Sequence, residues 1–222
     1  MNCDEYILVN NLKINCKLMG FNNHPKQPTL LVFPGGPGLG YSPYEPYIRF
    51  LEQYLSVLYY DPRGCGKSNK ATSENDYCLA TYISDAYALL QHFNINQVII
   101  LGTSYGTTAA INFALQYPTL LAGLMLVTGA PSYHFLLEAK KILAERGTAE
   151  QIQVCKNLWQ GSFESLQQIT EFFQIMAPLY SMRAKATGIQ PYSKVNCALE
   201  PLNQGFKTQF GHFDFIKQLT AE

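Results

Sequence analysis

The sequence predicts an α/β fold, a mostly parallel β-sheet with helices on both faces that is followed by a block of helices. Strand and helix signals alternate through residues 6–127, which is typical of parallel sheets. Some strands are apolar throughout, such as 29–33, as expected for strands buried on both faces. With 222 residues, 47% apolar and 14% charged, the chain can bury a sizeable core and does not have the composition of a disordered protein.

The individual elements follow from hydrophobic periodicity and turn signals. Strands are predicted at 6–9, 12–19, 29–33, 55–60, 97–101 and 122–127. Helices are predicted at 46–54, 79–93 and 105–117. The pair Asn10-Asn11 is typical of a turn between the first two strands, and Pro118 ends the last of these helices.

Residues 132–186 differ from the first half because helical patterns follow one another with no strand between them. Two apolar stripes are expected, one formed by Leu136, Leu137, Ile142 and Leu143 and the other by Leu166, Ile169, Phe172, Phe173 and Met176. We therefore expect a sheet core at 1–130, a helical lid at 131–212 and a return toward the core at 213–222.

Charge and cysteine content bound the function classes. Sixteen basic and sixteen acidic residues give a formal net charge of zero, which argues against nucleic acid or an anionic membrane as the main partner. The first residues lack a secretory-signal pattern, and the apolar runs are short for a membrane span. The six cysteines are scattered without metal-binding spacing, so we expect reduced thiols in a cytoplasmic protein.

The strongest chemical signal is Gly102-Thr103-Ser104-Tyr105-Gly106, which fits G-x-S-x-G between a predicted strand and a predicted helix. Such a tight turn exposes the serine hydroxyl at the carboxyl edge of the sheet, and the helix N-terminus behind it favours an oxyanion. This context predicts that Ser104 is a nucleophile rather than a structural serine.

A second signal is the glycine-rich run at 34–40, which follows the strand 29–33. A backbone N–H of Gly35 or Gly36 can complete an oxyanion hole together with the N–H of Tyr105. Read without the serine motif, the same run is only a turn rich in glycine and proline.

The run Asp61 to Ser68 ends in Gly-Lys-Ser and superficially matches the end of a P-loop. The position five residues before Gly66 is Asp61 rather than glycine, and no helix signal follows, so nucleotide binding is rejected. We expect Asp61 and Arg63 instead to tie this segment to the neighbouring glycine-rich loop.

Taken together and in this order, the three motifs resemble those of the α/β-hydrolases of the proline iminopeptidase family, and the resemblance extends over essentially the whole chain. It implies release of an N-terminal proline or another small residue from peptides through an acyl-enzyme on Ser104, with no metal or cofactor. By position, Tyr105 and Gly35 or Gly36 supply the oxyanion donors, and Glu200 is a candidate for binding the substrate amine. Pro34 stands where the family has a histidine.

The acid and base that should activate Ser104 are not apparent. In this fold they follow the serine, acid before base, and the histidines after Ser104 are His134 and His212. His134 lies at a predicted lid-helix start, and His212 precedes Asp214, which is the wrong order. We therefore expect the triad aspartate and histidine, together with the family's last strands, to be missing from this chain. The strand 122–127 would then be an open edge capable of self-association.

Two other functions stay open at this point. The fold also serves esterases of other specificity, which would cleave short acyl esters faster than peptide analogues. A non-catalytic binding module would retain the lid groove but would not react at Ser104 with a fluorophosphonate.

Overall fold

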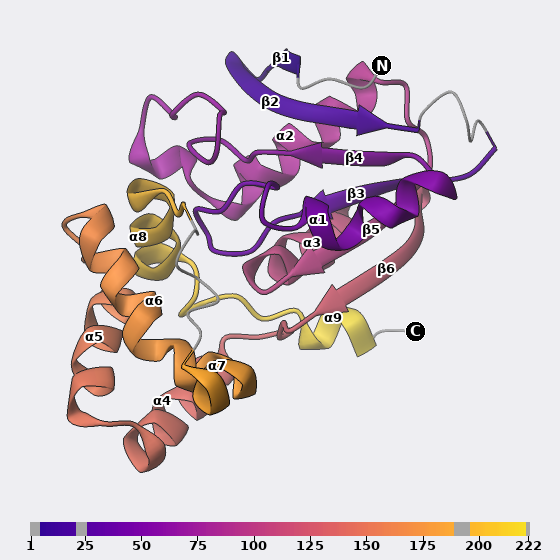
Figure 1. Cartoon of the computed structure of the whole chain (residues 1–222). Helices are drawn as coiled ribbons and strands as arrows, with labels where there is room; N and C mark the ends of the chain where they lie inside the picture. The colour runs from indigo at the N-terminus through magenta and orange to yellow at the C-terminus, as the bar shows by residue number, and fades with distance from the viewer. Residues whose placement is uncertain (1–4, 21–25, 189–195, 221–222) are drawn as a thin grey trace.

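The computed structural model describes residues 5–20, 26–188 and 196–220, and the following statements concern these residues. Six strands form one sheet in the order β1-β2-β4-β3-β5-β6, and a group of helices lies beside one end of it (Figure 1). β4, β3, β5 and β6 run parallel to one another, whereas β1 and β2 pair antiparallel. The predicted mostly parallel α/β sheet is confirmed.

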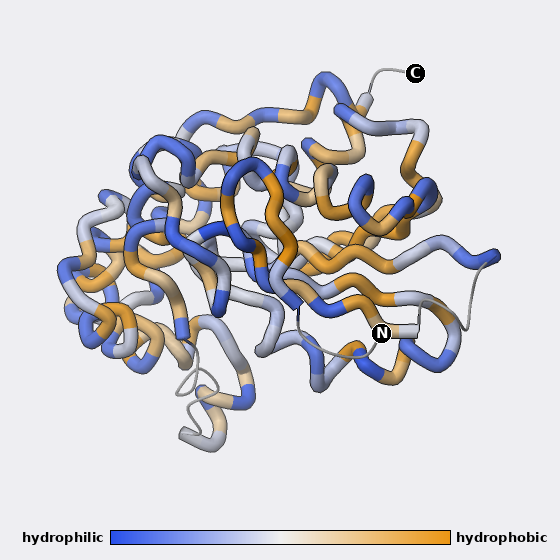
Figure 2. The backbone as a smooth tube through the Cα atoms, turned by 90° about the horizontal axis from the view of Figure 1, so that it is seen from above, coloured by the Kyte–Doolittle hydropathy of each residue, from blue (hydrophilic) through white to orange (hydrophobic). Residues whose placement is uncertain are grey.

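The strands lie close to their predicted positions. They are β1 (Glu5–Val9), β2 (Leu12–Met19), β3 (Thr29–Phe33), β4 (Val57–Tyr60), β5 (Val98–Thr103) and β6 (Leu121–Val127). Asn10 and Asn11 both have positive φ, as a tight hairpin turn requires. All five residues of β3 are buried, in agreement with its uninterrupted apolar sequence. Figure 2 shows this apolar character along the central strands.

Helices cover the two faces of the sheet through alternating residues of the strands. On one face, Leu31 and Leu58 pack with α2 (Leu79–His92) and α3 (Tyr105–Gln116). On the other face, Leu30 and Val57 pack with α1 (Glu45–Ile48) and the 3₁₀ helix η1 (Arg49–Gln53). The predicted helix 46–54 is therefore a short α-helix that continues as a 3₁₀ turn.

The helical block contains α4 (His134–Arg146), α5 (Ala149–Gln160), α6 (Leu166–Tyr180), α7 (Met182–Thr187) and α8 (Leu199–Thr208). Its core includes Leu143, Ile169, Phe172 and Met176. The expected stripe of α4 is wrong in part, because Leu137 and Ile142 are about half exposed. α4 packs through a narrow stripe, so Leu143 is the one buried residue among the four of the expected stripe.

The chain leaves and rejoins the sheet region at neighbouring points. Tyr133 N–H donates to Phe213 O at 2.8 Å, and Phe215 N–H donates to Pro131 O at 2.9 Å. The short helix α9 (Ile216–Thr220) follows. No helix in the described part of the chain is long and apolar enough to cross a membrane.

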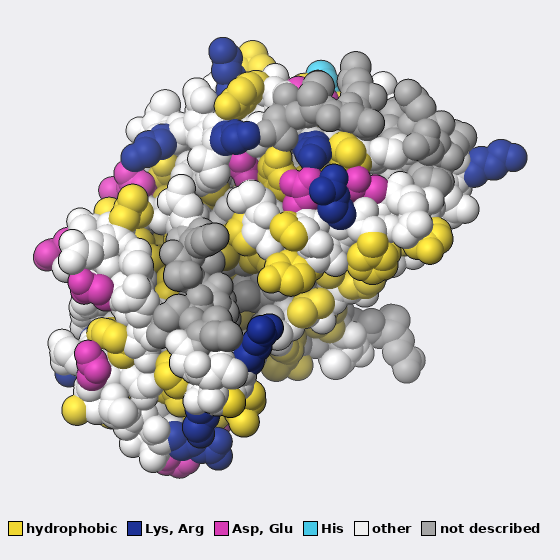
Figure 3. All heavy atoms as spheres, viewed as in Figure 1, with side chains coloured by type: hydrophobic (Ala, Val, Ile, Leu, Met, Phe, Trp, Pro, Cys, Tyr) yellow, Lys and Arg dark blue, Asp and Glu magenta, His cyan; other side chains and the backbone are white. Residues whose placement is uncertain are grey.

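In the described part of the chain, β6 forms one edge of the sheet. Within the described residues it pairs with β5 alone, and Met125, Leu126 and Val127 are 40–45% exposed. Figure 3 shows hydrophobic side chains on the face of the molecule that carries α1 and β6. Self-association through this edge stays a prediction.

Candidate active site

Ser104 lies at the turn between β5 and α3, where the backbone is strained. Its φ and ψ are 53° and −120°, a conformation that non-glycine residues rarely adopt. Ser104 N–H donates to Val127 O at 2.9 Å, and Thr107 N–H donates to Ser104 O at 2.9 Å. These bonds hold the turn while the Ser104 residue stays exposed. The geometry is that of a serine elbow, which presents its hydroxyl above the sheet edge.

Two glycines allow α3 to pack closely behind this turn. A Cβ on Gly106 would collide with Phe33 O and would lie 2.7 Å from Pro34 O. A Cβ on Gly102 would lie 2.5 Å from Gly106 O. Because these two glycines of the G-x-S-x-G motif have no side chain, α3, β5 and the end of β3 can lie close together.

Replacing Gly106 with alanine is expected to lower the free energy of unfolding by at least about 1–3 kcal/mol, because the backbone at Phe33 and Pro34 must move. Urea unfolding of the variant measures this loss. The matched control is Gly123→Ala in β6, where the nearest atoms lie 3.6 Å from the added Cβ. Equal stability of the two variants would contradict the close approach.

The glycine-rich loop lies directly against Ser104. A Cβ added at Gly35 would lie 3.2 Å from Ser104 Cβ and 2.9 Å from Thr103 O. Gly35 N–H donates to Tyr44 Oη at 2.8 Å, whereas Gly36 N–H has no hydrogen-bond acceptor among the described residues. Tyr105 N–H, the first of α3, also lacks one. Among the described residues, the N–H groups of Gly36 and Tyr105 are thus both backbone donors near Ser104 without acceptors.

The helical block contacts the same loop through the residues just before α8. Ala198 N–H donates to Gly38 O at 2.8 Å, and the Cys197 thiol donates to Pro37 O at 3.5 Å. Burial raises the pKa of the Cys197 thiol to about 12, so at neutral pH it is a protonated packing group. This buried thiol does not compete with Ser104 as a nucleophile.

Tyr105 also links the elbow to the helical block. Its hydroxyl donates to Gln209 Oε1 at 2.8 Å, and its ring lies 5.4 Å from that of Phe210. A cavity of about 260 Å³ adjoins these residues, and its walls include His212.

The described histidines that follow Ser104 do not hydrogen-bond to its hydroxyl. His134 Nδ1 lies 3.1 Å from Ser132 Oγ at the start of α4, and the exposed His212 follows α8. Asp214 accepts from Ile216 N–H at 3.1 Å, as a cap of α9. Among the described residues, the Ser104 hydroxyl has no hydrogen-bond partner.

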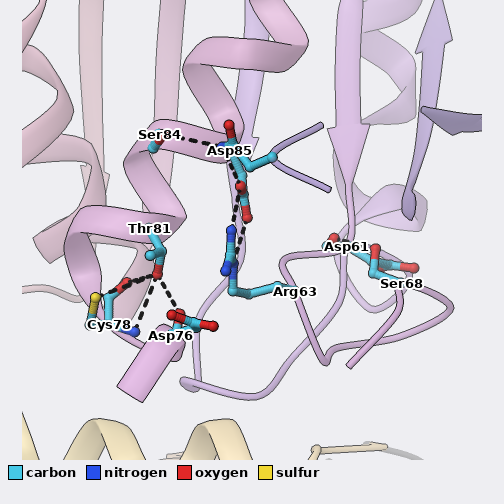
Figure 4. A network of polar contacts seen from close by, with 9 residues as sticks. Asp61, Arg63, Ser68, Asp76, Cys78, Thr81, Ser84 and Asp85 are labelled. Carbon is cyan, nitrogen blue, oxygen red and sulfur yellow. Dashed lines mark hydrogen bonds and ion pairs between the residues drawn. The ribbon is translucent and has the colours of Figure 1, made fainter. Parts of the chain in front are cut away.

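Asp61 supports the glycine-rich loop, as predicted. Its buried carboxylate accepts from Tyr41 N–H, Lys67 N–H and Asn15 Nδ2, each at 2.9 Å. Ser68 Oγ donates to Asp61 O at 2.6 Å (Figure 4). The segment that ends in Gly-Lys-Ser is thus a structural loop of this core.

The expectation that Arg63 joins the same loop is wrong. Arg63 forms a two-pronged pair with Asp85 of α2, at 2.7 and 2.6 Å (Figure 4). Both side chains are buried, and Asn10 Nδ2 donates to the same Asp85 carboxylate at 2.8 Å. The pair therefore fastens the Arg63 loop and the β1–β2 turn to α2. The sequence offered one signal for it, since Asp85 lies on the otherwise apolar face that contains Tyr82 and Leu89.

Glu200 lies in the first turn of α8, where it pairs with Lys70 at 2.6 Å. The hydrogen bond from Lys70 lowers the pKa of the Glu200 carboxyl. Lys70 is well exposed and Glu200 partly so, and the pair connects α8 to the loop that follows Asp61. Its assignment as a substrate-amine ligand stays a prediction.

A comparison with known protein families shows to which family this chain belongs. The model of the α/β hydrolase fold matches residues 28–200, which include the elbow and the glycine-rich loop. The chain belongs to the α/β-hydrolase fold family. Solved α/β-hydrolases agree with this fold: the chain aligns over 98% of its length with a hydrolase from Bacillus anthracis, at a TM-score of 0.74 and 17% identity, covering 77% of that chain.

Relatives of this α/β-hydrolase chain include several proline iminopeptidases. It is 31% identical to one from Saccharolobus solfataricus over 117 residues, which are 52% of this chain and 38% of the relative. It is 26% identical to PfmaB of Pestalotiopsis fici over 223 residues, 97% of this chain and 77% of the relative. The first of these alignments, like that with the Thermoplasma volcanium enzyme at 43%, spans less than half of the relative's length.

Proposed function

We propose that this chain is a serine hydrolase of the proline-iminopeptidase type, which releases an N-terminal proline or another small residue from peptides. The observation that carries the proposal is the strained, exposed Ser104 beside the N–H groups of Gly36 and Tyr105, which have no acceptors among the described residues. Several relatives are proline iminopeptidases, and their substrates suggest the substrate class of this chain.

In the proposed reaction, Ser104 Oγ attacks the carbonyl carbon of the N-terminal residue, and its hydroxyl proton passes to a water molecule, because no described side chain hydrogen-bonds to this hydroxyl. The carbonyl oxygen becomes an oxyanion, which Gly36 N–H and Tyr105 N–H stabilise as donors. The C–N bond then breaks, and the amine of the shortened peptide leaves with a proton. Water hydrolyses the acyl-enzyme and regenerates the Ser104 hydroxyl.

Proline 4-nitroanilide tests this proposal directly, with 4-nitrophenyl acetate as the comparison substrate. We expect release of nitroaniline from this anilide, and faster cleavage of the proline anilide than of anilides with longer acyl groups. Cleavage of the ester without cleavage of any aminoacyl anilide would favour an esterase instead. Failure of both substrates, together with failure of a fluorophosphonate probe to label Ser104, would refute the hydrolase proposal.

The two histidines that follow Ser104 in the described chain are proposed not to serve as its base. Replacing His134 or His212 with alanine is therefore expected to leave the rate of fluorophosphonate labelling within about threefold of that of the unmodified protein. A general base typically contributes about 10²–10⁴-fold. A loss of that size in either variant would identify the base and contradict the prediction.

A further inference from the structure

Tyr44 is a side chain of the site that the sequence motifs do not include. It precedes α1, and its hydroxyl accepts the Gly35 N–H at 2.8 Å. A Cβ added at Gly35 would lie 2.8 Å from Tyr44 Oη and 3.2 Å from Ser104 Cβ. The tyrosine hydroxyl and the serine side chain therefore border the same small volume around Gly35.

The backbone of Tyr44 is itself fixed to the core of the protein. Tyr44 N–H donates to Tyr41 O at 2.9 Å, and Tyr41 N–H donates to the buried Asp61 carboxylate at 2.9 Å. The Tyr41 ring also packs on that of Tyr59 in β4, with 5.4 Å between ring centres. The two ends of the loop from Gly35 to Tyr44 are thus joined by a hydrogen bond, and Asp61 binds the loop at Tyr41.

The hydrogen bond to Tyr44 distinguishes the two glycines at the start of the loop. The N–H groups of two successive residues point toward one oxyanion only if the backbone between them has a suitable conformation. Gly36 has a φ of +116°, which only glycine adopts readily. With Gly35 N–H donated to Tyr44, the peptide between Pro34 and Gly35 is held in one orientation, and the peptide that follows it carries the Gly36 N–H. Its neighbour Gly36 N–H is then the donor that has no acceptor in the described structure.

We propose that Tyr44 is a positioning residue of the oxyanion hole, which binds Gly35 N–H through its hydroxyl oxygen and so holds Gly36 N–H in place for the transition state. This inference rests on the proposed function, because it assigns a role within the same site. Tyr44 acts through the loop and makes no bond to the reacting atoms.

The test is Tyr44→Phe, which keeps the ring and removes the hydroxyl acceptor. Loss of a complete oxyanion donor costs about 10²–10³-fold, so we expect a misplaced donor to slow fluorophosphonate labelling and kcat on proline anilide by about 10- to 100-fold. KM should stay within about twofold, because the hydroxyl positions the loop rather than the substrate. Hydrogen exchange of the Gly35 amide, followed by NMR on glycine-labelled protein, should become faster.

Tyr47→Phe is the matched control, since Tyr47 lies in α1 and is 79% exposed. It should behave as the unmodified protein in all three measurements. Equal labelling and turnover rates for Tyr44→Phe and Tyr47→Phe, or an unchanged exchange rate of the Gly35 amide, would overturn the role of Tyr44. Labelling of the unmodified protein would in that case still support the proposed hydrolase. An unmodified protein that neither labels nor turns over would instead refute the proposed function, and this inference with it.

Discussion

Replacing Ser104 with alanine is expected to lower proline-anilide turnover by about 10³-fold or more, because no other described group can form the acyl-enzyme. The elbow is set by backbone bonds to Val127 and Thr107 rather than by the serine hydroxyl, so the variant should fold normally. Steady-state kinetics measure the loss, and thermal unfolding verifies the fold.

Ser42→Ala is the control for this variant, because Ser42 is an exposed serine that follows the same glycine-rich loop. It should retain full activity. Turnover by Ser104→Ala at more than a tenth of the original rate would show that the anilide is cleaved by another mechanism.

Replacing Asp85 with alanine is expected to lower the free energy of unfolding by about 3–5 kcal/mol. The Arg63 guanidinium would stay buried without its carboxylate, and Asn10 would lose an acceptor. Urea unfolding at neutral pH measures the effect. The double variant Arg63→Met/Asp85→Leu should recover much of the loss, since it leaves no buried charge unpaired.

The exposed pair of Lys70 and Glu200 supplies the contrast for this prediction. Lys70→Ala should leave the unfolding midpoint nearly unchanged, because water solvates the side chains of this pair. If Asp85→Ala and Lys70→Ala unfolded at the same urea midpoint, the result would contradict a structural role for the buried pair of Arg63 and Asp85.

The fold of the core could be predicted from local sequence patterns. Apolar strands such as β3 and the turn at Asn10 carry their signals within a few residues, and the structure confirms them. The elbow was predictable for the same reason, since the glycines around Ser104 are adjacent to it in sequence. Helix α4 was less predictable, because the core of the helical block covers only some of its apolar residues and Leu137 is about half exposed.

Contacts between distant segments could not be read from these patterns. Arg63 is followed by several acidic residues, and only the packing of α2 selects Asp85 as its partner. The bond from Gly35 to Tyr44 depends on the path of the intervening loop, which has no repeating pattern. For the same reason, Gly35 and Gly36 are equally good candidates for the oxyanion donor when only the motif is considered, whereas their hydrogen-bonding surroundings differ.

The proposed reaction requires Ser104 to be an activated nucleophile beside an oxyanion hole. Treatment of the folded 222-residue chain with a fluorophosphonate, followed by intact-mass measurement and peptide mapping, tests it most directly. We expect one adduct per chain, located on Ser104, and no adduct in Ser104→Ala or in protein unfolded by urea. A folded chain that stays unlabelled, or that is labelled at another residue, would contradict it.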